Sequence, residues 1–215
     1  GLRQTMATGF IFLAIPFEVS RQPWQFALLV LVAATQHKSA LLFMPFYFLL
    51  YMKHSRLMLV ASLIMFIPMW VYGSQIAGWL MMGNTFEQYL DYLQGYEGAG
   101  AYGFAAYIIL LGILLIYYHK AVVTSIPDTN LVLNSVAVAI VLTPLTMIDP
   151  SNMRIVQYYS IFALIALPWV ISKVNFSSVK NRYIIVTILL TIYTLTRGSE
   201  YAFFWQEMAL GANYQ

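Results

Sequence analysis

The sequence predicts an all-α, polytopic membrane protein built as a helical bundle. Of its 215 residues, 61% are hydrophobic and only 9% are charged, whereas a soluble domain usually carries about 25% charged residues. Apolar runs recur along the chain, and a spanning helix needs roughly 20 mostly apolar residues. The net charge of +3 is small and spread along the chain, so we expect no nucleic-acid partner. The chain has no cysteine, which excludes disulfides and thiolate metal sites.

About six apolar runs are candidate full spans, and two of them are short. The chain begins "GLRQT", without Met or a signal-peptide pattern, and enters an apolar run almost at once. We therefore expect residues 1–215 to form a single membrane domain that is truncated at its N-terminus. The candidate spans are residues 2–19, 57–73, 104–118, 131–148, 155–172 and 183–196.

The distribution of Lys and Arg predicts the orientation, because cytoplasmic loops carry an excess of these residues. Most of the basic residues fall in four loops, 18–23, 53–56, 119–129 and 173–182, if these are placed in the cytoplasm. Residues 74–103 then form a substantial extracytoplasmic loop with a short amphipathic helix at 85–94. The basic residues on the predicted cytoplasmic side are Arg21, Lys53, Arg56, Lys120, Lys173, Lys180 and Arg182.

A seventh apolar region, residues 24–52, is interrupted by "QHKS". Each half has about 13 residues, or near 20 Å as an α-helix, which is short of a hydrocarbon core of about 30 Å. Both flanks are basic and predicted to be cytoplasmic, so the region enters and returns. The expected structure is a broken, re-entrant hairpin of two short helices with His37, Lys38 and Ser39 at its tip, which is tolerated where it lines a cavity.

Several basic side chains remain on the predicted outer side, namely Arg3, His37, Lys38, Arg154 and Arg197. Planar guanidinium groups match the oxygens of phosphate, and a histidine can move a proton near neutral pH. Together these groups predict a site for a pyrophosphate-linked lipid at the outer leaflet.

Each of these residues also has a structural interpretation. Arg3 and Lys38 could be end or tip residues whose long side chains reach lipid headgroups. His37 could be a capped polar tip residue, and Arg154 could pair with Asp149 alone. The sequence contains no Walker loop, no HExxH, no G-x-S-x-G and no DxD-type pair. A cytoplasmic nucleotide-sugar enzyme is therefore disfavoured, and we expect no metal and no cofactor.

Three stretches resemble the EpsG family of exopolysaccharide polymerases, which is related to Wzy-type O-antigen polymerases. They are "LRQTMATGFIFLAI", "ALLVLVAATQHKSALLFMPFYFL" and "MRIVQYYSIFALIALPWVI". They carry the family's arginine–glutamine start, its histidine–x–serine break and its arginine before paired tyrosines. The resemblance covers about residues 2–52 and 152–172. The matching positions are Arg3, Gln4, His37, Ser39, Arg154, Tyr158 and Tyr159.

The resemblance implies a GT-C-like, metal-independent membrane glycosyltransferase of the bacterial inner membrane, with its site facing the extracytoplasmic side. The donor would be a growing glycan on undecaprenyl pyrophosphate, and the acceptor a sugar hydroxyl of another lipid-linked repeat in exopolysaccharide, capsule or O-antigen synthesis. Other polysaccharide-assembly membrane proteins are expected partners.

The chemistry of the residues themselves suggests their roles in such a reaction. Arg3 and Arg154 would hold the pyrophosphate and stabilise its leaving charge, and His37 would either orient a phosphate or take the acceptor's proton. The expected substrate-binding residues are Gln4, Lys38, Ser39, Tyr158 and Tyr159, with less weight on Lys38 because that position varies in the family.

Other functional classes remain open. A transporter or flippase of lipid-linked glycans also uses broken helices and charges at membrane depth, but it should show a pair of interrupted segments, and only one is evident in the sequence. A glycan ligase and a non-catalytic membrane scaffold are further alternatives.

Overall fold

The computed structural model describes residues 2–80, 101–124, 129–148, 152–173 and 187. All regular structure within these residues is helical, in agreement with the predicted all-α class. The chain divides into two compact units, Gly1–Lys173 and Val174–Gln215. Every helix and site named below belongs to the first unit.

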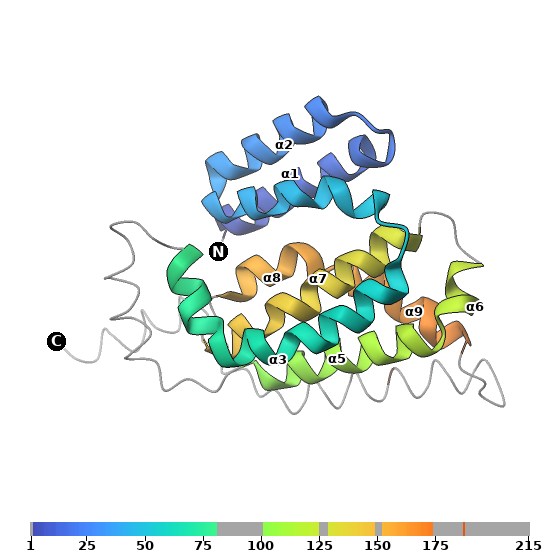
Figure 1. Cartoon of the computed structure of the whole chain (residues 1–215). Helices are drawn as coiled ribbons and strands as arrows, with labels where there is room; N and C mark the ends of the chain where they lie inside the picture. Colours follow the sequence, from blue (N-terminus) through green and yellow to red (C-terminus); the bar gives the residue numbers. More distant parts are fainter. Residues whose placement is uncertain (1, 81–100, 125–128, 149–151, 174–186, 188–215) are drawn as a thin grey trace, which may run out of the picture. The chain divides into compact units, whose positions relative to one another are not determined.

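Figure 1 shows the helices of the first unit, coloured in chain order. In chain order they are α1 (Leu2–Val19), α2 (Pro23–Gln36), the 3₁₀ helix η1 (Lys38–Tyr51), α3 (Ser55–Leu80), α5 (Tyr102–Tyr117), α6 (His119–Val123), α7 (Thr129–Ile148), α8 (Met153–Ser160) and α9 (Ala163–Lys173).

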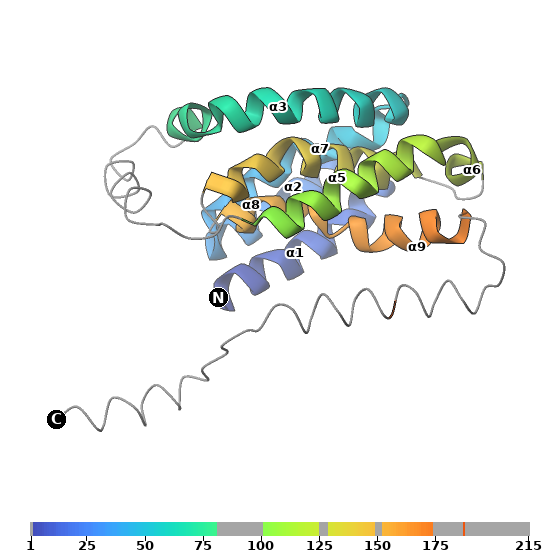
Figure 2. The same ribbon diagram turned by 90° about the horizontal axis from the view of Figure 1, so that it is seen from below.

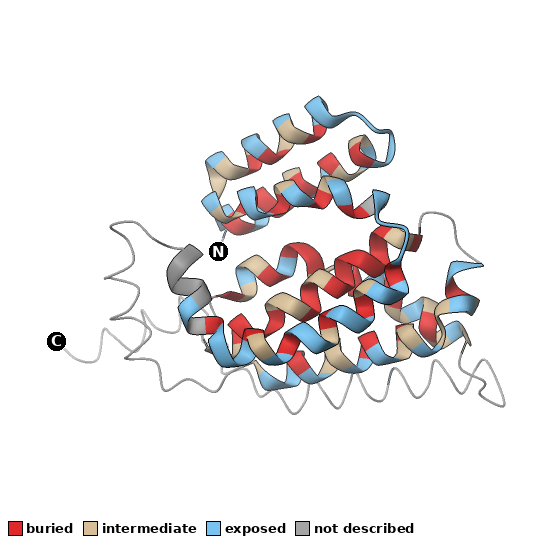
Figure 3. Cartoon of the chain, viewed as in Figure 1, coloured by how far each residue is buried: buried red, intermediate tan, exposed pale blue. Residues whose placement is uncertain are grey.

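Helix α7 is the centre of the packing. It contacts α3, α5, α8 and η1, and Figure 2 shows it among α3, α5 and α8. Of the apolar stretch of α7, 72% is buried, against 28% of the corresponding stretch of α3. Buried residues accordingly follow α7 along its length in Figure 3. Helix α3 instead turns much of its apolar surface outward, as a lipid-facing helix does.

Three buried hydroxyl groups of α7 find their hydrogen-bond partners within the helix. The hydroxyl groups of Ser135, Thr143 and Thr146 each donate to a backbone carbonyl three or four residues earlier, at 2.6–2.7 Å. Such bonds remove the cost of burying a hydroxyl away from water. Polar side chains in α7 are therefore compatible with its central position.

Helices α2 and η1 fold back on each other at His37, so the expected break and chain reversal are present. The ring of Phe26 in α2 lies 5.4–6.5 Å from the rings of Phe43, Phe46 and Tyr47 in η1. Helix α2 starts at Pro23, which suits the first turn because its missing N–H would have no partner there. The two arms form the α2–η1 hairpin, whose tip is His37.

The second arm is a 3₁₀ helix rather than an α-helix. Its buried residues, Ala40, Phe43, Phe46 and Leu49, recur every three positions, which matches three residues per turn. With a rise of about 2.0 Å per residue, its 14 residues span about 28 Å. The expectation of near 20 Å is therefore wrong for this arm, which approaches the thickness of a hydrocarbon core.

The predicted count of six spans is not confirmed. In the described part of the chain, two helices are long and apolar enough to cross a bilayer, at Ser55–Gly73 and Thr129–Met147, or three if α8 and α9 form one bent span. Helix α5 has 16 residues, and α1 carries Arg3, Gln4 and Glu18 among its 18. The predicted span at 183–196 lies outside the described residues.

Three local predictions need correction. The expected continuous span 155–172 is two helices, α8 and α9, bent by 48°. The expected loop 74–103 begins later, because α3 continues to Leu80, and ends earlier, because α5 starts at Tyr102; the predicted helix 85–94 lies outside the described residues. Glu18, placed in a loop by the sequence, is fully buried in the last turn of α1.

Candidate active site at the tip of the hairpin

Three distant stretches of the chain meet at the tip of the α2–η1 hairpin. They enclose a cavity of about 400 Å³ that is lined by Leu2, Arg3, Gln4, His37 and Arg154. We call it the tip cavity. The start of α1, the break between α2 and η1, and the start of α8 each contribute to it. All three sequence-predicted catalytic residues, and Gln4, therefore line one cavity.

Gln4 connects two of these stretches. Its side chain is buried, and its Nε2 donates to the backbone carbonyl of Arg154 at 3.0 Å. A carbonyl can only accept, so the amide nitrogen must face Arg154. The Oε1 atom of Gln4 is buried and has no hydrogen-bond partner among the described residues. An unpaired buried acceptor is costly, so the bond from Nε2 to Arg154 is what Gln4 contributes to the stability of this site.

His37 has a defined ring orientation. It ends α2 in an extended conformation, with φ −150° and ψ 114°. Its Nδ1 lies 3.4 Å from the backbone N of Ser39 and 2.8 Å from the Ser39 hydroxyl. The backbone N–H can only donate, so Nδ1 is the acceptor and the neutral ring carries its proton on Nε2. His37 is thus the N-cap of η1.

The charge state of His37 follows from its surroundings. Burial, and then the positive charge of Arg154, lower the pKa of His37 below its ordinary value of 6.5. The ring is therefore neutral at pH 7, which is the state that keeps Nδ1 available to Ser39. The positive charge of the tip cavity comes from the exposed Arg3 and Arg154.

The other predicted substrate-binding residues do not line the tip cavity. Lys38 is exposed beside it. Tyr158 and Tyr159 are buried, and the Tyr158 hydroxyl lies 3.3 Å from that of Ser39. Ser39 thus contacts both His37 and Tyr158, and this chain of contacts connects the hairpin tip to α8.

Tyr159 compensates for a proline in η1. In a 3₁₀ helix the N–H of residue 45 would donate to the carbonyl of residue 42, but Pro45 has no N–H. The Tyr159 hydroxyl donates to that Leu42 carbonyl at 2.6 Å. The Tyr159 ring also contacts those of Phe43 and Phe46. Tyr159 therefore holds η1 in place from α8.

Asn134 in α7 was not singled out from the sequence. Its Nδ2 donates to the carbonyls of Leu49 and Met52, at 2.7 and 2.8 Å. These carbonyls end η1, so Asn134 anchors the far end of the same arm. A single asparagine within an apolar run was the one signal that could have drawn attention to it.

The described residues contain no group of three or more His, Cys, Asp or Glu side chains placed to hold a metal ion. The chemistry that the tip cavity offers comes from two guanidinium groups and a neutral imidazole N–H. Such a set binds phosphate oxygens and sugar hydroxyls.

The comparisons with known proteins agree with the resemblance seen in the sequence. The family model described as "EpsG family" matches residues 1–209, which is nearly the whole chain. No curated protein and no solved structure shows significant similarity to it. Together with its long apolar helices, this match shows that the chain belongs to the EpsG family and is a membrane protein of the exopolysaccharide-polymerase type.

Proposed function

We propose that this protein is an integral membrane glycosyltransferase that joins undecaprenyl-pyrophosphate-linked oligosaccharide repeats on the extracytoplasmic side of the bacterial inner membrane. The observation that carries the proposal is the tip cavity, where Arg3, Gln4, His37 and Arg154 converge from three stretches. A cavity of this composition suits a sugar attached to a diphosphate, because both chemical groups find partners in it.

The two arginines act on the pyrophosphate. Their guanidinium groups are fixed positive charges that match phosphate oxygens in pairs. The acceptor hydroxyl oxygen forms a bond to the anomeric carbon of the donor sugar, and the bond from that carbon to the pyrophosphate oxygen breaks. The electron pair leaves with undecaprenyl pyrophosphate, whose growing negative charge Arg3 and Arg154 stabilise.

His37 acts as a hydrogen-bond donor in this scheme. Because Nδ1 accepts from Ser39, the neutral ring offers Nε2–H, which orients a phosphate oxygen. A ring protonated on Nε2 does not take a proton there, so this geometry favours the orienting role over the general-base role. The proton of the acceptor hydroxyl passes to a phosphate oxygen of the released pyrophosphate.

The remaining residues position or extend the site. Gln4 holds the start of α8 in place, because its Nε2 donates to the Arg154 carbonyl. Ser39, Tyr158 and Tyr159 hold His37 and η1 rather than touch the sugar. Lys38 adds a positive charge at the rim. Residues 74–103, which the sequence predicts as an extracytoplasmic loop, would hold glycan.

One observation favours a second candidate, a transporter or flippase of lipid-linked glycans. Two segments are interrupted in the part of the chain that the structure describes, at the hairpin break at His37 and at the 48° bend between α8 and α9. The middle of η1 contacts this bend through the rings of Phe46 and Phe162, whose centroids are 5.2 Å apart. Paired broken helices are a feature of transporters, and the sequence had shown only one.

Reconstitution of the purified full chain distinguishes these functions. Fluorescently labelled lipid-linked repeats are supplied in vesicles, and products are separated by length while a membrane-impermeant quencher reports transfer between leaflets. We expect a ladder of products in which each step adds one repeat. Movement of the lipid-linked repeats between leaflets without chain growth would contradict the polymerase and support the flippase. Transfer of glycan only to an acceptor that carries no lipid-linked repeat would support the ligase.

A further inference from the structure

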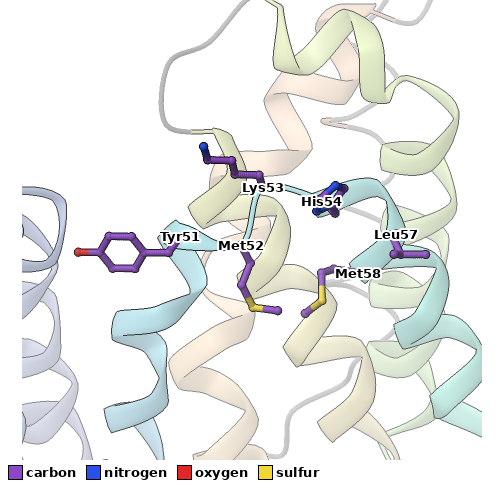
Figure 4. A pocket seen from close by; sticks show the side chains of 6 residues that line it. All are labelled: Tyr51, Met52, Lys53, His54, Leu57 and Met58. Carbon is purple, nitrogen blue, oxygen red and sulfur yellow. The ribbon is translucent and has the colours of Figure 1, made fainter.

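The opposite end of η1 carries two cavities that the proposed reaction does not use. One, of about 410 Å³, is lined by Tyr51, Met52, Lys53, His54, Leu57 and Met58. The other, of about 540 Å³, shares Lys53, His54 and Leu57 with the first and adds Ser55, Arg56, Val60, Ile116 and His119. We call them the base cavities. Figure 4 shows Lys53 and His54 above Met52 and Met58 in the first one.

The rim of the base cavities is basic. Lys53, His54 and Arg56 are exposed and line them. Neither lining includes an aspartate or a glutamate among the residues that the structure describes. An anionic group of a ligand would therefore meet the positive charges of Lys53 and Arg56 in this lining.

The floor and outer wall of the base cavities are apolar. They include Leu57, Met58, Val60 and Ile116. On the outward face of α3, Leu57, Val60 and Ile64 follow one another at helical spacing and are all exposed. An acyl chain lying along this stripe would start beside the basic rim.

The two base cavities sit where a membrane span begins. The apolar stretch of α3 starts at Ser55, so Lys53, His54 and Arg56 lie at the level of lipid headgroups. Ser55 is buried, and its hydroxyl lies 2.9 Å from Nε2 of His119. This contact joins the start of α3 to α6 and fixes one wall of the larger cavity.

We propose that the base cavities bind an anionic phospholipid of the leaflet that the distribution of Lys and Arg predicts to be cytoplasmic. Lys53 and Arg56 hold the phosphate, and the acyl chains follow the apolar face of α3. Basic pockets between membrane helices bind anionic headgroups in this way. The site is separate from the tip cavity and does not depend on the reaction proposed for it.

Native mass spectrometry of the detergent-solubilised full chain tests the proposal. The protein is titrated with phosphatidylglycerol or with phosphatidylcholine of the same acyl chains, and the fraction carrying a bound lipid is measured. We expect phosphatidylglycerol to be retained at concentrations roughly tenfold lower. Equal retention of the two lipids by the wild-type chain would overturn the proposal, whatever the variants do.

A matched pair of double variants locates the site. Lys53→Gln with Arg56→Gln should weaken binding of phosphatidylglycerol roughly 10- to 30-fold, since each charge near an anionic headgroup contributes measurably. Lys120→Gln with Lys173→Gln removes two charges from the same predicted side, and neither residue lines the base cavities. An equal loss in both double variants would show general attraction rather than a site. Displacement of the lipid by soluble glycerol phosphate would show a free-phosphate site, which also contradicts the proposal.

Discussion

The tip cavity and the base cavities lie at opposite ends of the same 14-residue helix η1, and both are basic. The tip cavity brings Arg154 together with residues more than 100 positions earlier, and partly buried hydrogen bonds through Gln4, Ser39 and Tyr158 fix its shape. The base cavities are lined mainly by residues 51–60, and their basic side chains, Lys53, His54 and Arg56, are exposed. We therefore expect the tip cavity to select its phosphate ester by fixed geometry, and the base cavities to bind a phosphate mainly through charge.

The largest effect should come from removing a guanidinium group at the tip. Arg154→Ala should lower the rate of chain growth by about 10² to 10³, the usual loss when a group that stabilises developing negative charge is removed. Arg154→Lys should recover only part of the activity, because a point charge does not reproduce the planar fork. The measurement is the product ladder from reconstituted vesicles.

Lys120→Ala is the control for this prediction, because Lys120 lines neither the tip cavity nor the base cavities. It should give the wild-type ladder. A wild-type chain length from Arg154→Ala would remove Arg154 from the proposed site.

The next effect concerns the base end of η1. Asn134→Leu replaces the amide by an apolar side chain of similar size in α7. The carbonyls of Leu49 and Met52 then lose their donor. We expect the free energy of unfolding in detergent to fall by about 1–3 kcal/mol. Ser135→Ala is a suitable control, because its hydroxyl bonds only within α7. Equal stability of both variants would show that Asn134 does not anchor η1.

A smaller effect is expected for Tyr159 near the tip. Tyr159→Phe removes the donor to the Leu42 carbonyl and should cost about 1 kcal/mol of unfolding free energy. Pro45→Ala would give residue 45 an N–H that can donate to the same carbonyl. The cost of Tyr159→Phe should therefore shrink in the Pro45→Ala background, as a double-mutant cycle can measure. Purely additive costs would contradict the compensation between Tyr159 and Pro45.

The smallest effect is a pH dependence. The pKa of His37 is lowered by burial and by Arg154, and the pKa of His119 near the base is lowered by burial and by Arg56. The unfolded chain therefore binds protons more readily, so stability is fully present above pH 6.5 and falls as the pH drops through the lowered pKa values. We expect less than about 1 kcal/mol for each partly exposed ring.

His37→Asn tests how much of the pH dependence of stability comes from His37, because asparagine can still cap η1 but does not titrate. Its unfolding free energy should vary less between pH 7 and pH 5 than that of the wild type. His119→Asn makes the same test at the base. A wild-type pH dependence in both variants would assign the effect to other groups.

Much of the fold could be predicted from the sequence. The bounds of the first helix agree with the predicted 2–19, because its apolar run is interrupted only near its ends. The break at His37 was predicted because a histidine and a lysine cannot continue an apolar run without cost. The three-residue spacing of Ala40, Phe43, Phe46 and Leu49 was also present, but their neighbours are apolar as well, so it could not be told from an α-helical pattern.

Other features depended on contacts that no local pattern contains. The bend between α8 and α9 falls inside an apolar run that looks continuous. Tyr158 and Tyr159 are placed against η1 rather than in the tip cavity. The burial of Glu18 depends on the packing around the last turn of α1.

By itself, the sequence determined that this chain is a helical membrane protein with a polar break at His37, because composition and the apolar runs suffice for both, and its short motifs predicted the EpsG family that the family model shows. Only the tertiary structure decided that Arg3, Gln4, His37 and Arg154 share one cavity. It also decided the tautomer of His37, because the Ser39 N–H donates to Nδ1 and the ring proton is then on Nε2. The physical reason is that hydrogen bonds between distant residues depend on their positions in space, which hydrophobic periodicity does not specify.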